Sequence, residues 1–196
     1  MSKQTEKEIL ISGFGGQGIV LTGNIIGKAA TLYDNKFATM TQSYGPEARG
    51  GSCSSQVVIS EEEILFPYVE NPQILICMSH EGFNKNRESL IKGGLLIWDS
   101  DLVTVSQPDE SWKLYNIPAT RFAEELGNKM MANIVILGFF SALSEVICAD
   151  SLCKAVLISV PAKTKEMNSI AFDRGREYGM EILKSYTMQE KRRGIQ

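Results

Sequence analysis

The sequence has few of the residues that carry redox, metal or acid–base chemistry. His80 is the only histidine, and the four cysteines, Cys53, Cys77, Cys148 and Cys153, include no C-x-x-C pair. Iron–sulfur clusters and structural zinc sites take their ligands from grouped cysteines and histidines. The sequence therefore predicts no metal site in this chain. Because disulfides are rare in cytoplasmic proteins, we expect reduced thiols.

Long apolar runs and a strong excess of one charge are also missing. The 196 residues carry a formal net charge of −3, which gives no basic footprint for nucleic acid. No apolar run approaches the length of a membrane-spanning helix, and residues 1–7 lack the apolar core of a signal peptide. With 43% hydrophobic and 22% charged residues, the chain is typical of a soluble globular protein. We expect one cytoplasmic domain over residues 1–196, bound to neither membrane nor nucleic acid.

The first thirty or so residues predict a strand, a glycine-rich turn and a helix. Residues 9–11 are apolar, the segment Gly13–Gly18 reads GFGGQG, and apolar residues then recur at helical spacing over 19–29. The glycines allow backbone angles and close approaches that a side chain would block. A glycine turn at a helix N-terminus presents free N–H groups and the positive end of the helix dipole. This unit is therefore a candidate seat for an anion.

Gly13, Gly15 and Gly18 also satisfy the G-x-G-x-x-G pattern of dinucleotide-binding folds. Such folds place an acidic residue about 20 residues further on, at the end of the second strand, to hold the ribose. Here the second predicted strand, 36–40, is followed by Thr-Gln-Ser, and Asp34 precedes the strand, at the wrong edge of the sheet. The NAD hypothesis therefore loses its main support.

A second glycine-rich segment covers residues 42–51. Gly45-Pro46 and Gly50-Gly51 are turn signals, so Tyr44, Glu47 and Arg49 are expected on a loop. Because the loop follows a strand, it should emerge at the carboxyl edge of the sheet, beside the first glycine turn, where open α/β folds bind ligands. The alternative is an exposed connection with a local ion pair between Glu47 and Arg49.

The remaining residues predict an alternation of strands and helices, which indicates an α/β protein. We expect a three-layer α/β/α, Rossmann-like fold whose sheet is mostly parallel, with an antiparallel hairpin or edge. The hairpin is assigned to the strands at 52–60 and 64–66, and an apolar helix at 133–143 is expected to be buried in the domain or under a partner subunit. The other predicted strands are 73–78, 95–98, 102–105 and 113–117, and the other helices are 81–92, 120–126, 151–159 and 164–184.

Three polar residues near strand ends could have either a structural or a chemical role. His80 precedes a predicted helix and has no visible partner for general-base chemistry, so a capping or surface role is favoured. Asp99 and Asp101 follow a strand at its carboxyl end, where a turn is favoured over a ligand contact.

Taken together, the two glycine segments closely resemble the gamma subunit of 2-oxoacid:ferredoxin oxidoreductases. Residues 13–19 read GFGGQGI and residues 43–51 read SYGPEARGG. The segments VVIS at 57–60, NIVILG at 133–138 and NSIAFDRG at 168–175 are also similar to that family, so the resemblance covers nearly the whole chain. The second glycine segment looks most like the 2-oxoglutarate and branched-chain 2-oxoacid branches.

The resemblance implies a multi-subunit enzyme that oxidatively decarboxylates a 2-oxoacid to acyl-CoA and reduces ferredoxin, in anaerobic metabolism. Thiamine diphosphate, Mg and iron–sulfur clusters would belong to partner subunits of alpha, beta and delta type. This chain would hold no catalytic residue, no metal ligand and no tightly bound cofactor, and would be inactive alone. The isolated chain is expected to form homodimers through surfaces meant for its partners.

A share in binding coenzyme A at the surface is the role that the residues suggest within such a complex. Its pyrophosphate suits the helix N-terminus, with Arg49 adding a charge-assisted bond. The candidate contacts are Gly13, Gly15, Gly16, Gln17, Gly18, Tyr44, Glu47, Arg49 and Gly50.

Other hypotheses stay open beside this one. The two segments are equally suited to serve only as an interface with another subunit. Within the family, the substrate is 2-oxoglutarate in the leading hypothesis and 2-ketoisovalerate or pyruvate in the alternatives. Outside the family, the alternatives are a stand-alone NAD-dependent oxidoreductase and a nucleotide-sensing scaffold.

Overall fold

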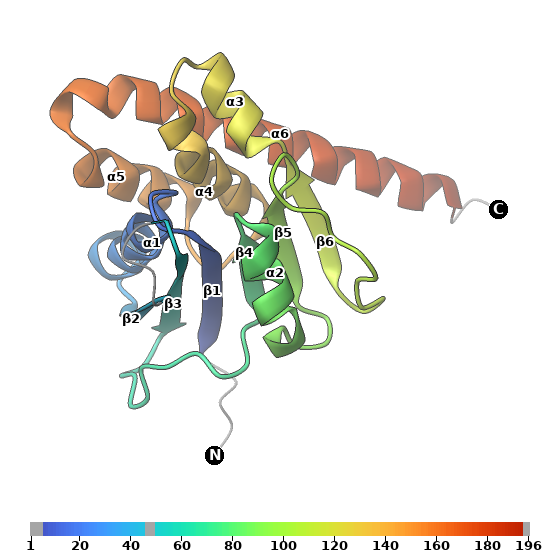
Figure 1. Ribbon diagram of the computed structural model, residues 1–196, viewed down its shortest axis with the longest axis horizontal. Coiled ribbons are helices and arrows are strands. Elements are labelled where there is room, and N and C mark those ends of the chain that lie inside the picture. The colour runs from blue at the N-terminus through green and yellow to red at the C-terminus, as the bar shows by residue number, and fades with distance from the viewer. Residues whose placement is uncertain (1–5, 46–49, 194–196) are drawn as a thin grey trace.

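A six-stranded mixed sheet forms the centre of the molecule, in the strand order β2-β3-β1-β4-β5-β6 (Figure 1). The computed structural model describes residues 6–45 and 50–193. The strands are β1 (Lys7–Phe14), β2 (Phe37–Tyr44), β3 (Ser52–Ser60), β4 (Ile74–Cys77), β5 (Leu95–Asp99) and β6 (Lys113–Ile117). The helices are α1 (Ile19–Tyr33), α2 (His80–Asn86), α3 (Ala119–Glu125), α4 (Ala132–Leu143), α5 (Ala149–Ser159) and α6 (Lys165–Arg193). Short 3₁₀ turns cover Arg87–Ser89, Lys129–Met131 and Ala162–Thr164.

The direction of the strands places two loops at the same edge of the sheet. β1, β4, β5 and β6 are parallel, whereas β3 is antiparallel to both of its neighbours, β1 and β2. β2 therefore runs in the same direction as β1, and the two strands end at the same edge. The chain leaves β1 toward β2 on one side and returns as β4 on the other. The seam between β1 and β4 is thus the point where the strand order reverses, the usual ligand position in open α/β sheets.

Alternate residues of the strands feed two separate cores, as expected for a three-layer fold. Ile9 and Ile11 belong to the larger core, which they share with residues of α1, α4, α5 and α6. Leu10 faces the other way, into a smaller core with Phe83 of α2. The sequence-based expectation of an α/β fold with a mostly parallel sheet is confirmed, and the apolar helix α4 is buried within the domain.

The predicted hairpin partner at 64–66 is wrong, and so is the predicted strand at 102–105. β3 finds its antiparallel partners in β1 and β2 instead, so the hairpin consists of β2 and β3. Residues 61–72 form a loop that connects β3 to β4 past the start of β1. Hydrogen bonds from the backbone N–H groups of Glu70 and Asn71 to Glu8 Oε2, each 2.7 Å, hold this loop in place. With β3 already paired on both sides, no free edge remains beside it for a strand at 64–66.

Two glycines allow α4 and α6 to pack backbone against backbone. A Cβ atom on Gly138 of α4 would overlap the carbonyl oxygen of Phe172, and one on Gly175 of α6 would overlap the carbonyl oxygen of Val135. Figure 1 shows α6 running across α4 and continuing past β6. The close crossing buries Phe172, which is fully enclosed in the larger core.

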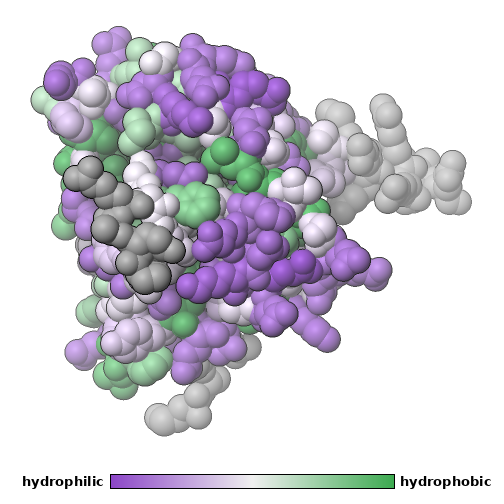
Figure 2. All heavy atoms as spheres, in the orientation of Figure 1, coloured by the Kyte–Doolittle hydropathy of each residue, from purple (hydrophilic) through white to green (hydrophobic). Residues whose placement is uncertain are grey.

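The face of the molecule that carries α2 is mostly hydrophilic, with hydrophobic residues in small separate groups (Figure 2). Within residues 6–45 and 50–193, no helix is long and apolar enough to cross a membrane.

The α4–α6 crossing predicts that Gly175→Ala is strongly destabilising. The added methyl group has no space beside the Val135 carbonyl, so the helices must separate, and we expect the free energy of unfolding to fall by about 3 kcal/mol. Gly27→Ala is the matched control, since a Cβ at that position of α1 meets nothing within 4 Å. It should leave stability unchanged or raise it by up to about 1 kcal/mol. Urea denaturation measures both, and a Gly175→Ala variant as stable as the Gly27→Ala variant would contradict the close crossing.

Candidate functional site

The segment Gly13–Gly18 forms the turn between β1 and α1, and its shape depends on two left-handed glycines. Gly16 has a φ of +94° and Gly18 a φ of +76°, angles that other residues rarely adopt. A Cβ on Gly18 would also lie 2.5 Å from Asn133 Nδ2 of α4. Gly16, by contrast, is exposed and has open space where its Cβ would be. Gly18 is therefore needed for packing, whereas Gly16 presents bare backbone to solvent.

Gln17 ties the glycine turn to the neighbouring strand. Its Oε1 accepts a hydrogen bond from the Phe14 N–H (2.6 Å), and its Nε2 donates to the carbonyl oxygen of Met78 (2.8 Å). Phe14 ends β1 and Met78 follows β4, so the side chain spans the seam where the strand order reverses. A Cβ on Gly13 would lie 2.5 Å from Gln17 Oε1, so Gly13 makes room for this side chain. The protein itself thus fills the inner end of the crevice.

The second glycine segment lies directly against the first, as the sequence predicts. The Gly15 N–H donates to the carbonyl oxygen of Gly51 (2.8 Å), and the Cβ position of Gly15 is 3.5 Å from the Gly50 nitrogen. Gly50 is exposed and has a φ of +69°.

The other predicted contacts of this segment are Tyr44, Glu47 and Arg49. Tyr44 is 62% exposed and occupies the last position of β2, not the loop on which it was predicted. Glu47 and Arg49 lie outside the described residues.

The N-terminus of α1, which follows the glycine turn directly, is uncapped. Its N-cap is Gly18, no side chain caps it, and its first turn carries no acidic residue. The first helical bond runs from Thr22 N–H to the Gly18 carbonyl (2.8 Å), which leaves the N–H groups of residues 19–21 without an intrahelical acceptor. Free N–H groups and the positive end of the dipole favour an anion here.

A small apolar pocket lies beside the turn, with a volume of about 110 Å³. Lys129 stands at this pocket with its ammonium group 3.5 Å from the carboxylate of Glu124, and Met130 is 64% exposed. Sequence reasoning missed both residues, because the contact between the start of α4 and the β1–α1 turn is tertiary and leaves no local pattern. The lining residues are Gly16, Gln17, Met78, Leu102, Thr120, Lys129, Met130 and Ala132.

Asp99 is a structural residue at the last position of β5, one residue before the turn in which it was predicted. Its carboxylate is buried and accepts hydrogen bonds from Thr120 N (3.0 Å), Thr120 Oγ1 (2.6 Å) and Asp101 N (3.1 Å). Burial raises the pKa of Asp99, which these hydrogen bonds partly offset by stabilising the anion. The interaction holds the start of α3 against the end of β5.

The other titratable residues of interest also have structural positions. His80 is the exposed first residue of α2, which Ser79 caps by accepting from the Gly82 N–H (3.0 Å). Asp34 lies at the opposite edge of the sheet from the glycine turn and accepts from the Cys148 N–H (2.7 Å). It is therefore not placed to hold a ribose at the turn.

The cysteines are free and dispersed, and burial raises the pKa of the Cys77 thiol far above its usual range. Within residues 6–45 and 50–193, no group of three or more histidine, cysteine, aspartate or glutamate side chains could hold a metal ion.

Fold and site together define a mixed α/β protein that presents two adjoining glycine segments, Gly13–Gly18 and Gly50–Gly51, at one edge of its sheet (the glycine edge). Residues 8–178 match the family model described as pyruvate ferredoxin/flavodoxin oxidoreductase. The chain is 49% identical to 2-oxoglutarate synthase subunit KorC of Methanocaldococcus jannaschii, over 90% of this chain and 95% of the relative. The chain therefore belongs to the pyruvate ferredoxin/flavodoxin oxidoreductase family.

Two solved structures share this fold. The gamma subunit of a keto/oxoacid ferredoxin oxidoreductase from Geobacter sulfurreducens is 38% identical, with a TM-score of 0.79 over 89% of this chain and 99% of that one. The 2-oxoglutarate:ferredoxin oxidoreductase of Magnetococcus marinus, solved with 2-oxoglutarate, coenzyme A and succinyl-CoA, has a TM-score of 0.82 at 22% identity, over 89% of this chain and 31% of that one. The resemblance to a gamma subunit of this class of oxidoreductase is thereby confirmed.

Proposed function

We propose that this chain is the gamma subunit of a 2-oxoglutarate:ferredoxin oxidoreductase and that its glycine edge helps to bind coenzyme A. The observation that carries the second part is the direct contact between Gly15 and Gly51 at the uncapped N-terminus of α1. In the overall reaction the 2-oxoacid loses CO₂, its acyl group is transferred to the thiol of coenzyme A, and two electrons pass to ferredoxin.

The choice of 2-oxoglutarate rests on the 49% identity to a 2-oxoglutarate synthase subunit over nearly the full length of both chains. The second glycine segment, SYGPEARGG, supports the same branch. 2-Ketoisovalerate and pyruvate remain the alternative substrates, since the residues that select the side chain of the 2-oxoacid belong mainly to partner subunits in this proposal.

Three features of the glycine edge support contact with coenzyme A. The N–H groups at the start of α1 suit its pyrophosphate, and Gly16 lets that group approach the backbone because no side chain stands there. The apolar pocket beside the turn suits an uncharged part of the same ligand, and Lys129 stands at its rim, where a phosphate would compete with Glu124 for the ammonium group. A single extended ligand with charged and uncharged parts would use all three.

The redox chemistry is assigned to other subunits. An iron–sulfur cluster needs several thiolates within reach of one another, but Cys53 and Cys77 are buried in the sheet and the chain's other two cysteines lie near α5. These donors do not fit a cluster. We propose alpha-, beta- and delta-type partners that hold the thiamine diphosphate, Mg and clusters, and that pass electrons to ferredoxin.

The first experiment tests the complex and its substrate. Affinity purification of this chain from its native cell should bring down subunits that bind thiamine diphosphate and iron–sulfur clusters. The purified assembly should reduce ferredoxin with 2-oxoglutarate and coenzyme A at a rate at least about tenfold above that with pyruvate or 2-ketoisovalerate. Such a ratio corresponds to a difference of roughly 1.4 kcal/mol in activation free energy. A preference for another 2-oxoacid would overturn the substrate assignment, and turnover by the isolated chain would overturn the subunit role.

The second experiment tests the contact with coenzyme A in the assembled enzyme. Lys129→Gln removes the cation at the pocket, and Gly16→Val blocks the open backbone of the turn. We expect the Kd for coenzyme A to rise about threefold to tenfold with the first change and more with the second, with Lys163→Gln as a charge-matched control. If both variants assemble normally and bind coenzyme A as the wild type does, the glycine edge is an interface only.

A further inference from the structure

A half-open hollow lies at the edge of the sheet opposite the glycine turn. It has a volume of about 620 Å³, within the range of small-molecule sites. Five segments of the chain surround it: the start of β1, the α1–β2 junction, the end of β3, the start of β6, and the end of α4 with the loop that follows. The lining residues that carry charge are Lys7, Lys36, Glu61, Lys113 and Glu145.

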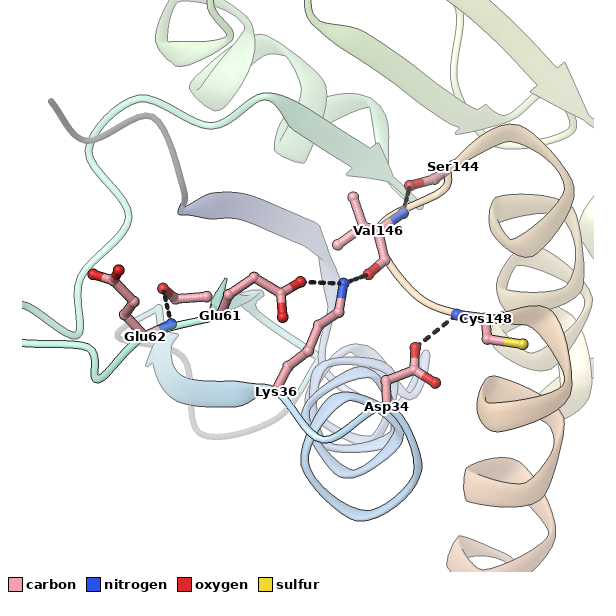
Figure 3. Close-up of polar contacts among 8 residues, drawn as sticks. Asp34, Lys36, Glu61, Glu62, Ser144, Val146 and Cys148 are labelled. Atoms are coloured by element: carbon pink, nitrogen blue, oxygen red, sulfur yellow. Dashed lines mark hydrogen bonds and ion pairs between the residues drawn. The ribbon is translucent and has the colours of Figure 1, made fainter.

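Lys36 fixes one wall of this hollow (Figure 3). Its Nζ lies 3.0 Å from Glu61 Oε1 and donates to the carbonyl oxygen of Val146 at 3.1 Å. The Lys36 side chain is 23% exposed, and it links the α1–β2 junction to the end of β3 and to the α4–α5 loop. A neighbouring bond from the Cys148 N–H to Asp34 holds the same loop in place. The wall is therefore a fixed structure, not a chance hollow between loose side chains.

The charges of the hollow do not cancel. Glu61 is neutralised by Lys36, which leaves Lys7, Lys113 and Glu145. Within the described part of the chain, neither the Lys7 nor the Lys113 ammonium group has an acceptor. Lys7 and Lys113 outnumber Glu145, which leaves the hollow with an excess of one positive charge. This excess favours an anion, and because both lysines are exposed, added salt weakens the attraction.

We propose that this hollow binds a small molecule with two or more negative charges, held between the ammonium groups of Lys7 and Lys113 with Lys36 at the wall. Phosphate groups and carboxylates share this chemistry, and lysine binds both as a point charge. The site is separate from the glycine edge. The 15 residues of α1 lie between them, about 22 Å of helix at 1.5 Å per residue. The proposal does not depend on the role of the glycine turn.

Isothermal titration calorimetry on the full chain tests this site, with inorganic pyrophosphate and malonate as probes. The wild type should bind at least one of them with a Kd of about 1 mM or tighter at low salt, and the affinity should fall with added NaCl. The double variant Lys7→Gln/Lys113→Gln should weaken binding at least about tenfold. The double variant Lys163→Gln/Lys184→Gln, with the same loss of charge on exposed positions of the C-terminal helices, should bind as the wild type does. The stronger of the two probes identifies the preferred anion.

Backbone amide chemical shifts of the wild type provide a readout that does not depend on the folding of any variant. Addition of the stronger probe should shift the amides of Ser60, Glu61 and Glu145, whatever shifts an anion at the N-terminus of α1 causes at Gly15–Gly18. The proposal is overturned if neither probe saturates, if the Lys7/Lys113 variant binds as tightly as the wild type, or if the shifts are confined to the glycine turn. If neither probe saturates, the hollow binds neither anion, and either of the other two results would indicate an adventitious ion only.

Discussion

Two hydrogen bonds of one side chain, Gln17, hold the glycine edge of this protein together. Gln17 accepts from the end of β1 and donates to the residue after β4, so it closes the seam at which the order of the strands reverses. A second glutamine closes the same seam at the opposite edge, where Gln73 Oε1 accepts from the Glu8 N–H at 2.6 Å. Side-chain hydrogen bonds thus join β1 to both ends of β4, in addition to the backbone hydrogen bonds between the two strands. The glycine turn takes its position from the first of these ties.

The hydrogen bonds of Gln17 argue against a dinucleotide site at the G-x-G-x-x-G pattern. In a dinucleotide fold the crevice at the seam is open to the cofactor, and an acid at the end of the second strand holds the ribose. Here Gln17 occupies the inner end of the crevice, and Asp34 is bonded to the Cys148 N–H at the other edge. The exposed part of the turn, Gly15 and Gly16, lies beside the second glycine segment and the pocket at Lys129. Such an arrangement suits a ligand or subunit that approaches from outside the sheet.

Much of the fold follows from local patterns in the sequence. The apolar run of β1, the glycines that follow it and the helical spacing of α1 predict the first unit correctly, because these signals are local and agree with one another. The neighbourhood of Gly15 and Gly51 was also predictable, since both segments follow strands that end at the same edge. The failures were non-local. Residues 64–66 have the composition of a strand, but the pairing of β3 with both β1 and β2 leaves them no partner. Likewise, Lys129 reaches the site only through the packing of α4 on the turn.

The most direct test of the tie is amide hydrogen exchange in the full chain. If Gln17 positions the turn, Gln17→Ala should accelerate exchange at Phe14 and Gly15 by about fivefold to thirtyfold, since a lost hydrogen bond of roughly 1–2 kcal/mol changes the opening equilibrium by that factor. Gln73→Ala, the matched variant at the opposite edge, should accelerate exchange at Glu8 and leave Phe14 and Gly15 unaffected. Unchanged exchange at Phe14 and Gly15 in the Gln17→Ala variant would show that the turn holds its shape without this side chain, and would contradict the central role of Gln17 at the binding edge.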